Sequence, residues 1–166
     1  IEPQTGMQYS LGFYKDLMDG QLEASVEGYY KTMDNYLDYR SGAQLLMNEH
    51  LETEVLPTEG RAYGVEFMLK KPKGKINGWI GYTYSRTELR QSDPRITRPA
   101  NRGEWYPAEY DKPHDIKLVG NYQITQRYSA SLNVDYSTGR PQTMPVSQYY
   151  SNTIGATSFV FSERNG

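Results

Sequence analysis

Apolar and polar residues alternate along most of this chain, and this period of two limits the fold more than any other feature. The clearest run spans 128–137, where every second residue is Tyr, Ala, Leu or Val and the residues between are Ser, Asn or Asp. Successive side chains of a β-strand point to opposite faces, so the alternation predicts strands with one apolar face. No helical periodicity of comparable strength interrupts it. Six segments carry the alternation: 7–13, 22–31, 62–70, 76–85, 115–124 and 128–137.

The lengths of these segments and of their links favour a membrane barrel. Most run for about ten residues, which a tilted strand needs to cross a bilayer, whereas strands of soluble proteins usually have about five or six. The links at 17–20, 72–75 and 125–127 are tight turns, but those at 36–58 and 91–113 and the tail at 139–166 are long and polar. Short turns on one rim and long loops on the other predict an all-β antiparallel meander of the outer-membrane type.

Six strands are too few to close such a barrel, because single-chain bacterial membrane barrels begin at about eight strands. An open sheet in lipid would leave the amides of its edge strands unpaired. We therefore expect residues 1–166 to be one segment of a larger transmembrane β-barrel domain.

Tyrosine dominates the aromatic residues, with 16 Tyr against 4 Phe and 2 Trp. Its apolar ring and polar tip suit a boundary between lipid and water. If the long loops lie outside the cell, aromatic residues fall at both ends of the apolar faces and form two girdles. The opposite faces are polar, whereas a soluble barrel should have its polar residues outside. The upper girdle takes Tyr30, Tyr63, Tyr84 and Tyr136, the lower one Phe13, Tyr122 and Tyr128, and the lumen Glu23, Glu27, Lys31, Glu66, Lys117 and Asp135.

Composition and charge argue against several classes of protein. The absence of cysteine excludes a disulfide framework and thiol chemistry within this segment. A formal net charge of −2 and scattered Lys and Arg residues disfavour nucleic acid as a partner. No apolar run approaches the roughly 20 residues of a membrane helix. The low mean hydropathy of −0.79 is what strands with one lipid-facing and one lumen-facing side would have.

His114 beside Asp115 invites a catalytic hypothesis, since a carboxylate orients the imidazole of many acid–base sites. Adjacent residues at a strand start point to opposite faces, so the two cannot easily orient one another. No G-x-S-x-G motif is present, and neither His50 nor His114 has a metal-ligand pattern nearby. Asp34 and Asp38 could join a calcium cluster, although a solvated loop end is the simpler interpretation. We expect no catalytic residue, no bound metal, no cofactor and no enzymatic activity.

Four stretches resemble the barrels of TonB-dependent outer-membrane receptors. Residues 1–12 (IEPQTGMQYSLG) are similar to their "KPE…YELG" strand start, and residues 60–66 (GRAYGVE) to "G.AYGVE". Residues 77–86 (NGWIGYTYSR) and 110–119 (YDKPHDIKLV) resemble "GW..YTYSR" and "YDRPHD..L". The order of the four along the chain is more specific than any one of them.

The resemblance implies a 22-stranded barrel with an N-terminal plug that imports scarce ligands such as metal chelates, vitamins or oligosaccharides. The TonB complex of the inner membrane would supply the energy. The plug domain and the TonB box are not among these residues. Implied partners are outer-membrane lipid, the protein's own plug, the TonB complex and a surface lipoprotein. Glu23, Glu27, Glu66, Lys117 and Asp135 would face the lumen or the plug.

Aromatic and arginine side chains in the long loops are the candidates for ligand binding, because they can stack on sugars or hold anionic chelates. Interfacial anchoring or packing between loops is the competing interpretation. Two other functions stay open at this point: a passive porin or adhesin barrel without a plug, and a soluble ligand-binding β-barrel. The candidates are Tyr36, Tyr39, Arg40, Trp105, Tyr106, Tyr110, Tyr149 and Tyr150.

Overall fold

A computed structural model describes residues 3–40, 43, 46–94, 96–97, 99–152 and 155–165. Ile1 and Glu2, which open the first resembling stretch, lie outside the described residues. No helix in the described part of the chain is long and apolar enough to cross a membrane. The strands are β1 Thr5–Leu17, β2 Leu22–Tyr39, β3 Val55–Lys71, β4 Ile76–Arg90, β5 Tyr106–Pro107, β6 His114–Gln123, β7 Ser129–Ser137, β8 Pro145–Ser151 and β9 Ala156–Phe161, with short 3₁₀ turns η1 Leu51–Thr53 and η2 Ala100–Gly103.

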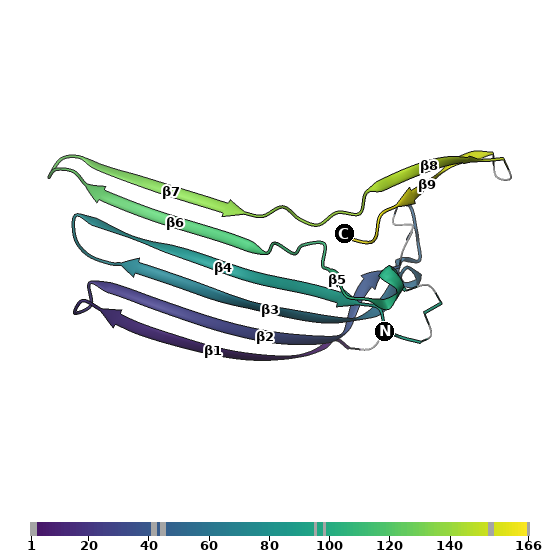
Figure 1. Ribbon diagram of the computed structural model, residues 1–166, viewed down its shortest axis with the longest axis horizontal. Helices are drawn as coiled ribbons and strands as arrows, with labels where there is room; N and C mark the ends of the chain where they lie inside the picture. Colours follow the sequence, from purple (N-terminus) through teal and green to yellow (C-terminus); the bar gives the residue numbers. More distant parts are fainter. Residues whose placement is uncertain are drawn as a thin grey trace.

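The long strands form one antiparallel sheet, in the order β1-β2-β3-β4-β6-β7, and β5 pairs with β4 beside it. Neighbours in the sheet are therefore neighbours in the sequence, as the predicted meander requires. The tight turns all lie at one end of the sheet and the long connections at the other (Figure 1). This confirms the predicted all-β meander with short turns on one rim. The sheet is not closed, and β1 and β7 are its edges.

The strand register joins the predicted apolar faces into one surface. One row of paired residues crosses the sheet from Phe13 through Val26, Phe67, Tyr82 and Ile116 to Tyr136. The next residue on every strand belongs to the opposite surface. We call the surface that carries this row the outward face and the other the inward face.

The aromatic borders of the outward face run obliquely to these rows. Tyr136 on β7 shares its row with Val26, four residues from Tyr30 on β2. Four residues at about 3.3 Å each, over four strand spacings of about 4.8 Å, give a slant of about 35°. At the other border, Phe13 on β1 shares its row with Ile116, six residues from Tyr122 on β6, which gives about 45°. Strands of membrane barrels tilt by roughly this angle, about 35–45°.

On the inward face, aromatic rings lie over glycines. A Cβ on Gly64 would lie 2.6 Å from the carbonyl oxygen of Tyr84 and 2.9 Å from the ring of Tyr29. The Tyr14 ring lies in the same way over Gly12, where a Cβ would come within 3.1 Å of it. Without a Cβ, these glycines leave room for the aromatic rings to cover the backbone of the sheet. Aromatic side chains cover strand glycines in other β-proteins in the same way.

The loop rim is more regular than the sequence predicts. β2 continues to Tyr39 past an irregularity between Met33 and Tyr36, where Asn35 has φ of 56°. The loop expected from residue 36 therefore begins later, and Tyr36 and Tyr39 belong to a strand. The tail expected as a long polar link contains the β8–β9 hairpin, which projects beyond the main sheet (Figure 1). Tyr149 and Tyr150 thus lie on a strand of this hairpin.

The few fully buried apolar side chains of the described residues gather at this rim. Leu89, Ala100, Tyr106 and Ala108 form a small core, and Tyr36 packs against it. Leu89 pairs with Tyr106 on the inward face, so the core lies on the side expected to face the lumen. Most large side chains of the outward face are exposed, so no comparable core packs on that face among the described residues.

Candidate ligand-binding rim

Arg164 ties the end of β2, the connection between β4 and β6 and the tail after β9 together above the inward face. Its Nη2 lies 2.8 Å from Asp38 Oδ1 at the end of β2, and its Nη1 donates to the carbonyl oxygen of Tyr39. Its backbone N–H donates to Asn101 Oδ1 at 2.7 Å. The Asn101 amide returns a hydrogen bond of 3.1 Å to the Arg164 carbonyl. Residues 126 positions apart in the sequence are thereby held in contact.

Tyr106 completes this loop clamp, which we define as Asp38, Asn101, Tyr106 and Arg164. Its hydroxyl donates to Asp38 Oδ2 at 2.7 Å, and the Arg164 guanidinium lies 5.6 Å from its ring centroid. The side chain has no exposed surface. Burial raises the pKa of the Tyr106 phenol above its ordinary value, and the Asp38 carboxylate raises it further. Tyr106 therefore packs between the loops, which was the alternative to ligand binding in the sequence analysis. Its buried ring is not accessible to a ligand.

Trp105 occupies a different place from its neighbour. The centroid of its ring lies 4.2 Å from Arg61 Cζ and 4.7 Å from Arg90 Cζ, within the range of cation–π contacts. Arg61 pairs with Glu88 at 2.7 Å and Arg90 with Glu59 at 2.5 Å. By the strand register these four residues share the outward face with Tyr63. Trp105 thus belongs to the outer wall beyond the Tyr30–Tyr63 pair, where an interfacial anchor would lie.

The remaining candidates leave surface for a ligand. Tyr110 is about half exposed, and partial burial, with the hydrogen bond to Tyr36, raises the pKa of its phenol. Tyr39 is exposed at the end of β2. Arg40, which follows it, forms a bidentate pair with Glu54 at 2.6 and 2.7 Å. Tyr149 and Tyr150 are the most exposed of the set, at 57% and 62%. Tyr39 and Arg40 directly follow Asp38 of the loop clamp, whereas Tyr149 and Tyr150 lie on the separate β8–β9 hairpin.

The predicted lumen residues all lie on the inward face. Glu27 pairs in register with Glu66, and Lys117 with Asp135. Glu23 accepts an ion pair from Lys70 at 3.1 Å. Glu27 accepts a hydrogen bond of 3.1 Å from the Tyr14 hydroxyl. The partners of Glu23 and Glu27 thus lie within the sheet. Glu66 and Asp135 are exposed on the inward face.

His114 and Asp115 diverge as adjacent strand residues must. The His114 Nδ1 lies 2.9 Å from the Tyr82 hydroxyl on the outward face, whereas Asp115 lies 3.5 Å from Lys117 on the inward face. The pair cannot work as an oriented acid–base dyad. His50 lies 3.2 Å from Glu52, and Asp38 belongs to the loop clamp. Within the described ranges, no group of three or more His, Asp or Glu residues is placed to hold a metal ion.

The sequence signals missed half of the loop clamp and the side chains that support it. Arg164, Asn101 and Gln91 carry no local pattern, yet the buried Gln91 side chain accepts a hydrogen bond of 2.8 Å from the backbone N–H of Ala100. Asn165 donates to the Pro107 carbonyl at 2.9 Å. Only Asp38 and Tyr106 were singled out, and for ligand roles. Side chains of this kind act through long-range contacts, which the order of residues alone does not show.

Comparison with known families decides what this sheet is part of. The family described as "TonB dependent receptor-like, beta-barrel" matches residues 1–164. The chain belongs to this family. Comparison with curated proteins and with solved structures found no match. The match covers both the strands and the long loops, so the sheet is a segment of a TonB-dependent receptor barrel.

The family membership agrees with the geometry of the sheet. TonB-dependent receptors are outer-membrane transporters rather than enzymes, and their barrels cross the membrane with antiparallel strands. The outward face of this TonB-dependent receptor segment is the apolar, slanted band. The inward face is the polar one. The separation of the two faces, predicted from alternation, is therefore confirmed by the register.

Proposed function

We propose that this chain supplies barrel wall and extracellular loops to an outer-membrane active transporter energised by the TonB complex. The cargo class is a scarce ligand: a metal chelate, a vitamin or an oligosaccharide. The family match over residues 1–164 is the observation that carries the proposal. The open edges at β1 and β7 support a larger closed barrel, because lipid does not tolerate unpaired strand edges.

The exposed loop-rim residues are the proposed first contacts of the ligand. Tyr110 offers a ring face above the inward side, and Tyr149 and Tyr150 offer two more on the β8–β9 hairpin. Tyr36 hydrogen-bonds to Tyr110, Tyr39 and Arg40 follow at the end of β2, and Arg40 supplies a cation for an anionic chelate once Glu54 yields. Aromatic and arginine anchors of this kind carry most of the binding energy at recognition surfaces. Tyr106 and Trp105 support this rim from below and outside.

The proposed partners follow from the two faces. Outer-membrane lipid covers the outward face. The protein's own plug domain meets Glu23, Glu27, Glu66, Lys117 and Asp135, and the TonB complex couples to regions beyond this chain. A surface lipoprotein would meet the loop rim, where the β8–β9 hairpin projects and residues 141–162 carry no charged side chain.

The test is growth of a Gram-negative deletion strain that carries the full-length protein on a plasmid. Ferric siderophores, cobalamin and maltooligosaccharides are supplied one at a time as the limiting nutrient. We expect growth on one of them to require both the receptor and an active TonB complex. Growth that requires the receptor but survives loss of TonB would instead indicate a passive pore.

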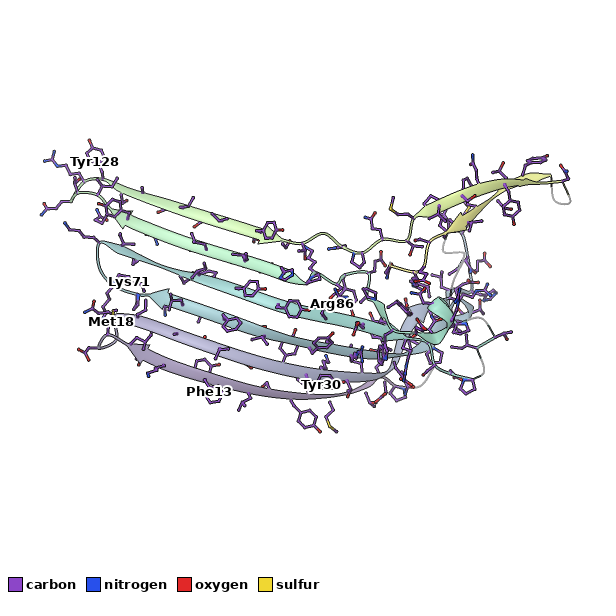
Figure 2. All side chains as sticks on the ribbon, viewed as in Figure 1. Phe13, Met18, Tyr30, Lys71, Arg86 and Tyr128 are labelled. Atoms are coloured by element: carbon purple, nitrogen blue, oxygen red, sulfur yellow. The ribbon has the colours of Figure 1, made fainter. Side chains whose placement is uncertain are left out.

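The rim assignment has its own test in the same strain. Tyr110→Ala should weaken ligand binding by about 1–3 kcal/mol, the usual loss at an aromatic anchor. Tyr128→Ala is the matched control, because Tyr128 is an exposed tyrosine, 70% against 48% for Tyr110, at the opposite, short-turn rim (Figure 2). Equal effects of the two substitutions would remove Tyr110 from the ligand site.

A further inference from the structure

The outward face carries one hollow among its large side chains, near the short-turn rim. Ala24 and Val26 on β2 are small, and Phe13 on β1 and Phe67 and Leu69 on β3 stand on either side of them. The result is an open groove of about 480 Å³ with an almost entirely apolar lining. Its apolar walls suit a hydrocarbon chain rather than a polar ligand.

A lysine closes this groove at its rim end. Lys15 lines the groove and pairs in register with Ala24. Lys71, at the end of β3, pairs in register with Gly78 and belongs to the same face. By strand geometry the two lysines are about 10 Å apart across the sheet and about 7 Å along it. Two flexible side chains can converge on one anion over that span.

The charges of the two faces differ sharply in this region. On β1, β2, β3 and the turn half of β4, the outward face carries Lys15 and Lys71 but no carboxylate between the Tyr30–Tyr63 pair and the turns. The neighbouring Lys70 points to the inward face and is paired there with Glu23. Within these described strands neither Lys15 nor Lys71 forms an ion pair, so both ammonium groups are available to an external anion.

We propose that this groove is a seat for one anionic glycerophospholipid of the leaflet at the short-turn rim. An acyl chain lies over Ala24 and Val26, and the Lys15 and Lys71 ammonium groups donate to the lipid phosphate. Lysine stems readily cover apolar surface while the charged head reaches the headgroup layer. Figure 2 shows Lys71 at this rim, near Met18 in the β1–β2 turn. The inference rests on the proposed function, because it requires the barrel to span a bilayer.

Native mass spectrometry of the full-length protein in detergent tests the seat, with phosphatidylglycerol and phosphatidylcholine as the added lipids. We expect one phosphatidylglycerol to remain bound at activation energies that strip phosphatidylcholine. Lys15→Gln and Lys71→Gln should each weaken phosphatidylglycerol binding by about fivefold, since a lysine near anionic lipid contributes roughly that factor. Ala24→Leu should weaken the binding of both lipids by filling the groove.

Lys73→Gln is the matched control, because Lys73 lies in the turn between β3 and β4 and belongs to no strand, whereas Lys15 lines the groove and Lys71 is on the outward face of β3. It should leave lipid retention unchanged. The proposed lipid site would be contradicted if Lys73→Gln and Lys15→Gln weakened phosphatidylglycerol binding equally, or if the protein retained the two lipids equally. Either result would indicate unspecific electrostatic attraction. Membrane fractionation separates this failure from that of the proposed function. A protein that stays in the outer membrane without a retained lipid contradicts the seat alone, whereas a soluble protein contradicts both.

Discussion

At the scale of single residues, Tyr29 packs closely over Gly64 on the inward face of the sheet. The space that a Cβ of Gly64 would need is occupied by the Tyr84 carbonyl and the Tyr29 ring. The side chain of Tyr29 would have to move, but the strand backbone cannot, because it is held by the ladder between β3 and β4. Glycine is thus required at this position by space.

Gly64→Ala should lower the free energy of unfolding of the full-length barrel by about 1–3 kcal/mol, the usual cost of overpacking. Urea unfolding in lipid vesicles, followed by tryptophan fluorescence, measures this. Gly120→Ala is the control, because its nearest neighbour to an added Cβ is 4.0 Å away. Equal stability of the two variants would contradict the fit described here.

The raised pKa of the Tyr106 phenol predicts that the protein loses stability at alkaline pH. Its pKa is raised in the folded protein, so the neutral phenol is favoured by the fold. The stability this contributes is complete below the ordinary tyrosine pKa of about 10 and is lost as pH rises above it. The negative charge of Asp38 and the positive charge of Arg164 face the same hydroxyl, and burial is the larger cause.

We therefore expect the long loops of the full-length protein to become sensitive to protease above about pH 10. Tyr106→Phe should cost about 1 kcal/mol at neutral pH through the lost hydrogen bond to Asp38 and should flatten the alkaline response. Tyr110 titrates in the same direction, so the Tyr106→Phe, Tyr110→Phe double variant should flatten it further. An unchanged alkaline response in the double variant would show that ionisation of Tyr106 and Tyr110 does not cause the loss of loop stability.

At the scale of elements, adjacent residues of each strand lie on opposite faces, which we propose to be the lipid side and the lumen side. Leu132 lies midway between Tyr128 and Tyr136 on the outward face of β7, and Asn133 is on the inward face. Leu132→Arg should cost about 2–4 kcal/mol of folding into lipid, the range for arginine at the midplane of a membrane barrel. Asn133→Arg should cost far less. Heat-modifiable gel migration measures the yield of each variant folded into vesicles. Equal yields of Leu132→Arg and Asn133→Arg would contradict the assignment of the two faces.

The strands and their faces were predictable because period two extends through every long strand, and the register preserves it from Phe13 to Tyr136. The β8–β9 hairpin was not, since adjacent Tyr149 and Tyr150 break the alternation and a register shift follows Pro145. The loop clamp was not either. Its Asp38 and Arg164 are joined only once the sheet has brought their loops to one rim.

At the scale of the whole molecule, the sheet has a direction as well as two faces. Tight turns occupy one rim, and the loop clamp and the β8–β9 hairpin occupy the other (Figure 1). The aromatic borders slant across the sheet by about 35–45°, so a membrane normal is inclined to the strands by that angle. Under the proposed function, we expect a ligand to meet the clamped loops first and the inward carboxylates afterwards, and lipid to meet only the outward face.

The central claim is that these two faces separate lipid from lumen in a membrane. The most direct measurement is labelling of single cysteines placed along β7 of the full-length protein in vesicles. Residues 1–166 contain no cysteine, and any cysteine outside them is first replaced by serine. A water-soluble maleimide should react with Asn133→Cys and Asp135→Cys but not with Leu132→Cys and Val134→Cys. Uniform labelling of all four, or labelling in the opposite phase, would contradict the account.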